Sequence, residues 1–223
     1  MSFDGIYTLL ARCIVLVLVI PVHELAHGWL AYQLGDPTAK RQGRLTLNPL
    51  KHFDPIGSAL MLLTGYGWAK AVPVNPRYFK KPRTGMALTA LAGPAANLLY
   101  ALLLLIVYRV AVIVIPVSPL YQTSGVFQMI VYGVLEVIWS MLTINVSLAV
   151  FNMLPVPPLD GSRIASLLLP ERLYYMLMQY ERYFFLAMAL ILFSGVFSKP
   201  LGICVQYVMY FLIRITDVIE ILL

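Results

Sequence analysis

The sequence predicts an all-α polytopic membrane protein, with about five spanning helices, a short re-entrant segment and small membrane-associated β-strands. Of its 223 residues, 61% are hydrophobic and only 12% are charged. A soluble domain has about a quarter of its residues charged, so this composition argues against an aqueous globule. The mean hydropathy of +0.83 supports the same prediction, as do several apolar segments near the roughly 20 residues that cross a bilayer.

Five apolar segments are candidate spanning helices. Gly93-Pro94 interrupts the second segment, and the proline-rich stretch 155–158 follows the third. Because proline disrupts a helix interior, the chain should leave the third segment on irregular backbone. The five segments cover about residues 7–34, 85–115, 126–154, 183–197 and 201–223.

Two basic loops flank a short apolar segment at residues 56–64. The loops, about residues 35–55 and 70–83, each contain a stretch that suits a β-strand, at residues 44–47 and 71–74. As a helix, the apolar segment would reach only about 14 Å, roughly half of the hydrocarbon core. We therefore predict that it is re-entrant and that both basic loops lie on the cytosolic side.

The charge balance supports this topology. The chain has 16 Lys and Arg residues against 10 Asp and Glu residues, which gives a formal charge of +6. In a membrane protein such an excess usually marks cytosolic loops beside anionic headgroups, so no nucleic-acid partner is expected. The N-terminus then lies outside, the first helix runs inward, and residues 155–182 return to the cytosolic side.

Residues 23–27 read His-Glu-Leu-Ala-His, an H-E-x-x-H pattern within the first apolar segment. Positions i and i+4 share one face of a helix, so His23 and His27 can occupy two positions of a tetrahedral zinc site. Glu24 can act there as a general base toward water. The alternative is a chance match with two histidines satisfied in a helical bundle. Three ionisable side chains in five residues are costly within a span, which favours a functional site.

A zinc site also needs a third protein ligand and an open position. Asp160 follows prolines at the inner end of a predicted span, where irregular backbone can present a carboxylate to a hydrated cavity. Asp36 and Asp54 precede prolines in turn-like sequence, where Asp is commonly a local cap. The carboxylate and imidazole candidates outside the motif are Asp36, His52, Asp54, Glu136 and Asp160.

Three motifs, in this order, resemble the signatures of the site-2 protease family of intramembrane zinc metalloproteases. They are HELAHG at residues 23–28, GPAAN at 93–97 and NMLPVPPLDG at 152–161. The resemblance covers roughly residues 7–165. The stretch GRLTLNPLKHFDPIG at 43–57 is also similar to compact bacterial members that lack appended PDZ or CBS domains.

The resemblance implies that His23, His27 and Asp160 bind one Zn²⁺ per chain and that Glu24 is the catalytic base. It implies a multi-pass protein of the cell membrane whose active site faces the cytosolic side. Its partners would be the lipid bilayer and transmembrane protein substrates, whose helices it would cut near the cytosolic face. An unwound substrate could add as a strand to the predicted strands of the basic loops.

We expect one domain over residues 1–223, with the catalytic core at about 7–165 and accessory helices at about 183–223. The resemblance also implies that Asn97 and Asn152 shape the site or hold substrate. For Asn97, hydrogen bonding between helices is the competing role.

Two other classes of function use the same residues. A membrane transporter could use the ionisable groups as a proton or metal-ion pathway. A catalytically silent membrane scaffold would retain only the fold. The intact H-E-x-x-H pattern argues against the scaffold, and no inverted repeat is visible in the sequence to favour a transporter.

Overall fold

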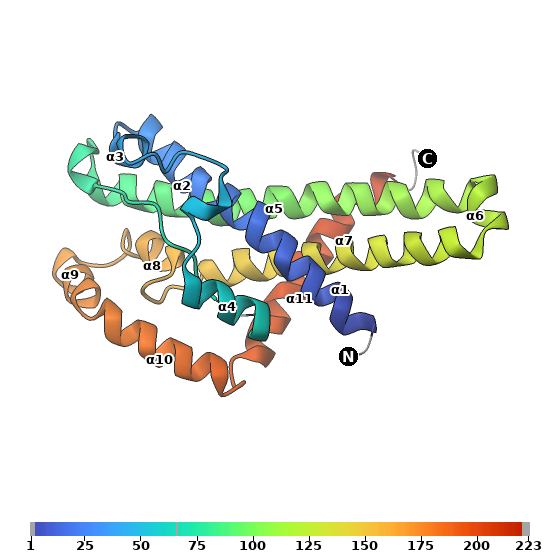
Figure 1. Ribbon diagram of the computed structural model, residues 1–223. Helices are drawn as coiled ribbons and strands as arrows, with labels where there is room; N and C mark the ends of the chain where they lie inside the picture. Colours follow the sequence, from blue (N-terminus) through green and yellow to red (C-terminus); the bar gives the residue numbers. More distant parts are fainter. Residues whose placement is uncertain (1–2, 66, 220–223) are drawn as a thin grey trace.

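The computed structural model describes residues 3–65 and 67–219, and these are helical or irregular throughout (Figure 1). In chain order the elements are α1 (Phe3–Ile14), the π-helix η1 (Val15–Val19), α2 (Ile20–Gln33), α3 (Thr38–Arg41), η2 (Pro49–Lys51), α4 (Pro55–Thr64), η3 (Pro76–Tyr78), α5 (Pro82–Val114), η4 (Ile115–Val117), α6 (Pro119–Thr123), α7 (Gly125–Asn152), α8 (Asp160–Ala165), α9 (Glu171–Gln179), α10 (Glu181–Phe193) and α11 (Ser198–Thr216).

Three helical stretches within the described residues are long and apolar enough to cross a membrane. They are Gly5–Gln33, which joins α1, η1 and α2, then Pro82–Val117, and Gly125–Asn152. The expected number of about five is therefore not supported. Helix α10 has 13 residues, which at about 1.5 Å each fall short of a hydrocarbon core of about 30 Å. Helix α11 has 19 residues but includes Lys199 and Arg214, which lower its hydropathy.

Helix α5 makes the most extensive packing contacts of the described helices. It packs along α7 and against α2, and α1 packs on α7 (Figure 1). One apolar core joins Leu105 of α5 to Leu142 of α7 and Val205 of α11. A second core joins Val19 of η1 to Met141 of α7. These contacts fix α2, α5 and α7 relative to one another, and the site described below lies where their ends meet.

The short apolar segment forms a helix, α4, which is fixed at both ends. The Asp54 side chain caps its start by accepting hydrogen bonds from the backbone N–H groups of Ile56 and Gly57. The helix ends at Gly65, whose φ of +86° lies in the left-handed region that favours glycine. At that end, Arg12 of α1 donates hydrogen bonds to carbonyls of the last turn, and a cation there also complements the helix dipole.

The predicted β-strands at residues 44–47 and 71–74 do not form in the described part of the chain. Residues 69–75, which we call the strap, are irregular, and their backbone is bound mainly by side chains and, at Lys70, by the carbonyl of His52. Glu24 accepts the N–H of Val72, and Asp36 accepts the N–H of Asn75. Because these carboxylates replace a ladder of backbone hydrogen bonds, the alternating sequence pattern gave the wrong secondary structure.

Candidate metal centre

Two histidines of α2 face a common point. Their side chains are one helical turn apart, and the Nε2 atoms of His23 and His27 are 3.0 Å from each other. Both residues are buried, at 9% and 8% exposed, although they lie on a helix that is apolar enough to span a membrane. Helix α2 packs against α5, which covers this face of the helix.

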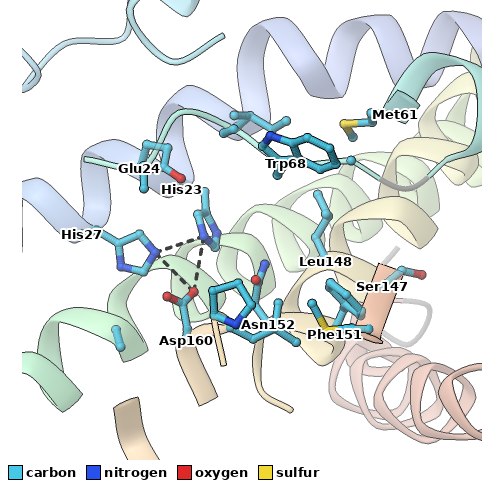
Figure 2. A pocket seen from close by; sticks show the side chains of 18 of the residues that line it. His23, Glu24, His27, Met61, Trp68, Ser147, Leu148, Phe151, Asn152 and Asp160 are labelled. Carbon is cyan, nitrogen blue, oxygen red and sulfur yellow. Dashed lines mark hydrogen bonds and ion pairs between the residues drawn. The ribbon is translucent and has the colours of Figure 1, made fainter. Parts of the chain in front are cut away.

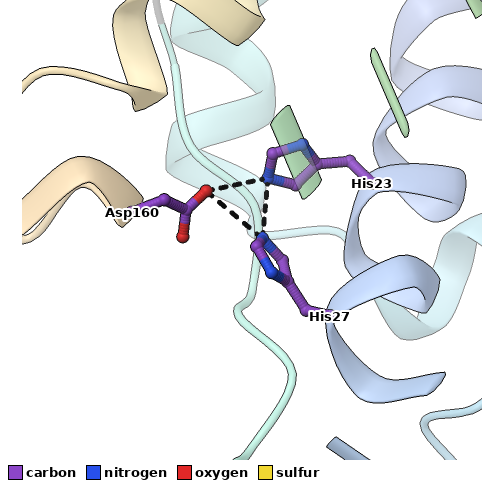
Figure 3. A group of neighbouring side chains, drawn as sticks. All are labelled: His23, His27 and Asp160. Carbon is purple, nitrogen blue, oxygen red and sulfur yellow. Dashed lines mark hydrogen bonds and ion pairs between the residues drawn. The ribbon is translucent and has the colours of Figure 1, made fainter. Parts of the chain in front are cut away.

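Asp160 approaches the same point from another part of the chain. Helix α7 ends at Asn152, an irregular proline-containing segment follows, and Asp160 is the first residue of α8. Its Oδ2 atom lies 3.5 Å from Nε2 of His23 and 3.3 Å from Nε2 of His27 (Figure 3). Burial alone would raise the pKa of the Asp160 carboxyl, but the two imidazoles offset this and lower it to about 2. Asp160 is therefore ionised at neutral pH.

The three converging atoms fit a zinc ion. Two imidazole nitrogens and a carboxylate oxygen are a common zinc ligand set, and ligand atoms of a tetrahedral site lie roughly 3.3 to 3.6 Å apart. The observed separations, between 3.0 and 3.5 Å, are close to this spacing. Nδ1 of His27 donates to the Thr89 carbonyl at 2.7 Å, so in the neutral ring the lone pair is on Nε2. With both rings neutral, three acceptor atoms meet at this point, and a cation between them would offset their mutual repulsion.

Gly93 of α5 makes room for both imidazoles. A Cβ atom at this position would lie 2.3 Å from Nε2 of His27 and 2.6 Å from Nε2 of His23. No side chain fits there without moving the rings. The close approach of the α5 backbone to α2 therefore depends on glycine at this position.

Glu24 faces the strap. Its Oε2 atom accepts a hydrogen bond of 2.8 Å from the N–H of Val72, and the side chain is buried. Glu24 is not one of the three converging residues, but it lines the same cavity as they do (Figure 2). This arrangement places a carboxylate beside the candidate metal centre but not among its three converging groups.

A cavity of about 780 Å³ opens beside these residues. Its walls come from the strap, the residues just before it and eight helices, which are α1, α2, α4, α5, α7, α8, α10 and α11. Trp68, Ser147 and Phe151 are among the lining residues that the sequence analysis did not identify (Figure 2). Aromatic and small polar residues are frequent along the whole chain, so no signal in the sequence distinguishes these three.

The other candidate ligands lie elsewhere. Asp54 caps α4, and Asp36 accepts the N–H groups of Thr38 and Asn75. His52 is fully buried, and its ring hydrogen-bonds the carbonyl of Thr46. Glu136 lies on α7 but does not line the cavity. Among the described residues, the structure therefore brings only Asp160 to the two histidines.

The two asparagines differ in their surroundings. Asn152, the last residue of α7, lines the cavity (Figure 2). Asn97 is 1% exposed on α5 and does not line it. Its carbonyl oxygen has no hydrogen-bond partner among the described residues.

Comparison with known proteins identifies related sequences. The model of the family described as Peptidase family M50 matches residues 11–195. The chain is 42% identical over 195 residues to the "Putative zinc metalloprotease YwhC" of Bacillus subtilis, covering 85% of this chain and 80% of that protein. It is 30% identical to the "Putative zinc metalloprotease Rip2" of Mycolicibacterium smegmatis, covering 72% of this chain but only 57% of that protein. No solved structure gives a significant match.

We expect Gly93→Ala to weaken retention of a divalent metal by about 10- to 100-fold, a typical effect of disturbing the support of a ligand. The reason is steric, since the added methyl group displaces both imidazoles. Metal content after dialysis against a chelator measures the effect. Gly202→Ala on α11 is the matched control, because its Cβ would meet nothing within 4 Å. Equal metal retention by the two variants would contradict the prediction.

Proposed function

The chain belongs to peptidase family M50, the site-2 protease family, and on that basis we propose that it is a zinc-dependent endopeptidase that cleaves membrane-spanning helices. The observation that carries this function is the meeting of His23, His27 and Asp160, with Glu24 beside them in a cavity bounded by candidate spanning helices. The family match gives no support to the alternative of a membrane transporter.

We propose His23, His27 and Asp160 as the ligands of one Zn²⁺ per chain. The set of two nitrogens and one oxygen leaves one position of a tetrahedral site open, as a catalytic zinc requires. Zinc, when bound, supplies a Lewis acid that polarises a peptide carbonyl and lowers the pKa of water toward neutrality. The hydrogen bond from His27 to the carbonyl of Thr89 orients one of these rings.

Glu24 is the proposed general base. Its Oε2 atom is occupied by the N–H of Val72, which leaves Oε1 to accept a proton from an attacking water molecule. The same carboxyl group can then donate that proton to the leaving amine. The buried environment holds the carboxylate in place and limits competing contacts with bulk water.

The cavity suits an unwound apolar segment of polypeptide. Leu148, Phe151 and Phe185 supply apolar walls, and Asn152 supplies an amide that can hydrogen-bond a freed substrate backbone. Asn97 lies outside the cavity, which supports a role for it in packing between helices. We retain residues 7–165 as the catalytic core, and the accessory helices also contribute walls of the cavity through Phe185 and Leu201.

The proposed topology places this site toward the cytosolic side of the cell membrane. The strap, which touches Glu24, belongs to the second basic loop, and such loops usually lie on the cytosolic side. Helix α4 connects the two loops and is too short to cross, since its 10 residues extend only about 15 Å. Cleavage would then occur near the cytosolic end of the substrate helix.

Replacing His23 or His27 by Ala should remove both zinc and cleavage, whereas Glu24→Gln should keep zinc and lower cleavage by about 10²- to 10⁴-fold. A neutral amide cannot accept the proton from water. Zinc per chain and the shortened product of a co-expressed single-span substrate are the two measurements. Cleavage at a comparable rate by purified Glu24→Gln would show that the assigned base is wrong.

Asp160→Asn should reduce zinc affinity by at least about tenfold, because the anionic ligand becomes a neutral amide of the same shape. Asp54→Asn is the matched control, since Asn caps a helix as well as Asp does and Asp54 lies at the start of α4. Isothermal competition with a zinc chelator measures both affinities. Full affinity in Asp160→Asn would mean that another carboxylate supplies the third ligand.

Single cysteines at Arg41 and Lys80, in a background lacking Cys13 and Cys204, test the topology. Both positions are exposed and lie on opposite sides of α4 in the sequence. An impermeant thiol reagent should label neither cysteine in intact cells and both after the inner face is opened, because both loops are placed in the cytosol. Labelling of the two positions from opposite sides would show that α4 crosses the membrane.

A further inference from the structure

We propose that Arg44 is a positioning residue for Glu24 and that it acts through the peptide group joining Ala71 to Val72. The inference rests on the proposed function, in which Glu24 is the general base. Arg44 belongs to the first basic loop, outside the three motifs and near the start of the stretch at 43–57 that is similar to compact family members. Its contacts are with backbone atoms of the strap.

The strap connects the two side chains. Nη2 of Arg44 donates hydrogen bonds to the carbonyl oxygens of Lys70 at 2.6 Å and of Ala71 at 3.3 Å. The next backbone group along the strap, the N–H of Val72, donates to Oε2 of Glu24 at 2.8 Å. Arg44 and Glu24 are both only 8% exposed, so water screens neither contact well.

One peptide group therefore lies between a cation and an anion. The carbonyl of Ala71 and the N–H of Val72 belong to the same planar peptide unit and point in opposite directions in its trans form. The guanidinium is at the oxygen end and the carboxylate is at the hydrogen end. Each charge polarises the peptide in the same sense, so each hydrogen bond strengthens the other.

This arrangement also gives both buried charges a hydrogen-bonding partner. A buried ionised side chain needs a partner, because its loss of hydration is otherwise uncompensated. In the part of the chain that the structure describes, neither Arg44 nor Glu24 forms a direct ion pair. The polarised peptide unit supplies the connection between them.

Other contacts hold the two ends of the strap, whereas Arg44 binds carbonyls between them. At one end the carbonyl of His52 accepts the N–H of Lys70 at 2.9 Å. At the other end Oδ2 of Asp36 accepts the N–H of Asn75 at 2.6 Å. A Cβ atom at Gly28 would lie 2.9 Å from Cγ1 of Val72, so the strap also presses directly on α2. Arg44 then sets the orientation of the one peptide that contacts Glu24.

The test compares purified, zinc-loaded Arg44→Gln and Arg44→Lys with wild type. Arg41→Gln is the matched control, since Arg41 lies in the same loop and is exposed. We expect Arg44→Gln to lower kcat for a single-span substrate by about 10- to 100-fold, with KM within about twofold and zinc content unchanged. Arg44→Lys should have a kcat between those of Arg44→Gln and wild type, because lysine keeps the positive charge but lacks the planar guanidinium group. Arg41→Gln should behave as wild type.

Hydrogen–deuterium exchange gives a readout that does not depend on activity. Arg44→Gln should speed exchange in peptides covering residues 69–75 and leave α5 and α7 unchanged. Glu24→Ala removes the acceptor of the Val72 N–H and should speed exchange in the same peptides. The double variant should exchange no faster than the single variants, because both substitutions break one chain of contacts.

Four results would overturn the inference. Unchanged kcat in Arg44→Gln, or a rise in KM alone, would show that the strap does not orient the base. Loss of zinc together with faster exchange throughout the chain would show a general structural role. Additive exchange in the double variant would show that Arg44 and Glu24 act independently. If Glu24→Gln were active, the proposed function itself would be refuted. If Glu24→Gln were inactive and Arg44→Gln fully active, only this inference would be refuted.

Discussion

Three ionisable side chains, His23, Glu24 and His27, are buried on a helix that is apolar enough to span a membrane. Their burial places a requirement on the rest of the chain. Each of these side chains needs a polar partner, and α2 itself supplies none beyond the contact between the two histidines. The partners come from the strap, from the backbone of α5 and from the start of α8. The packing of α2 on α5, the end of α7 and the path of the basic loops together bring these groups to one place.

The sequence predicted the parts of the site that depend on local geometry. The spacing of His23 and His27 follows from the helical repeat, and the prolines before Asp160 indicate where a helix must stop. The residues that hold Glu24 were not predictable in the same way. Arg44 contacts the strap through backbone carbonyls. Every residue has such a carbonyl, so no sequence pattern indicates which one Arg44 will contact.

The fold was predicted in class but not in detail. Apolar length identified three stretches correctly, and it identified α4 as a segment too short to span. The number of spans was predicted too high because two C-terminal helices were counted. Helix α10 is too short to cross the membrane, and α11 is too polar. The two β-strands were predicted wrongly for a different reason. An alternating pattern indicates which residues face inward, but it does not indicate whether a neighbouring strand is present.

The absence of a side chain at Gly93 has a consequence for how α2 and α5 can fit together. A slide of one helix along the other by one turn, about 5.4 Å, would bring Thr89 or Asn97 to the imidazole nitrogens in place of glycine. Either residue would carry a Cβ atom into space that the rings occupy. A slip of one turn in either direction is therefore incompatible with the site, and a bound metal ion would show that these two helices have assembled in the correct register.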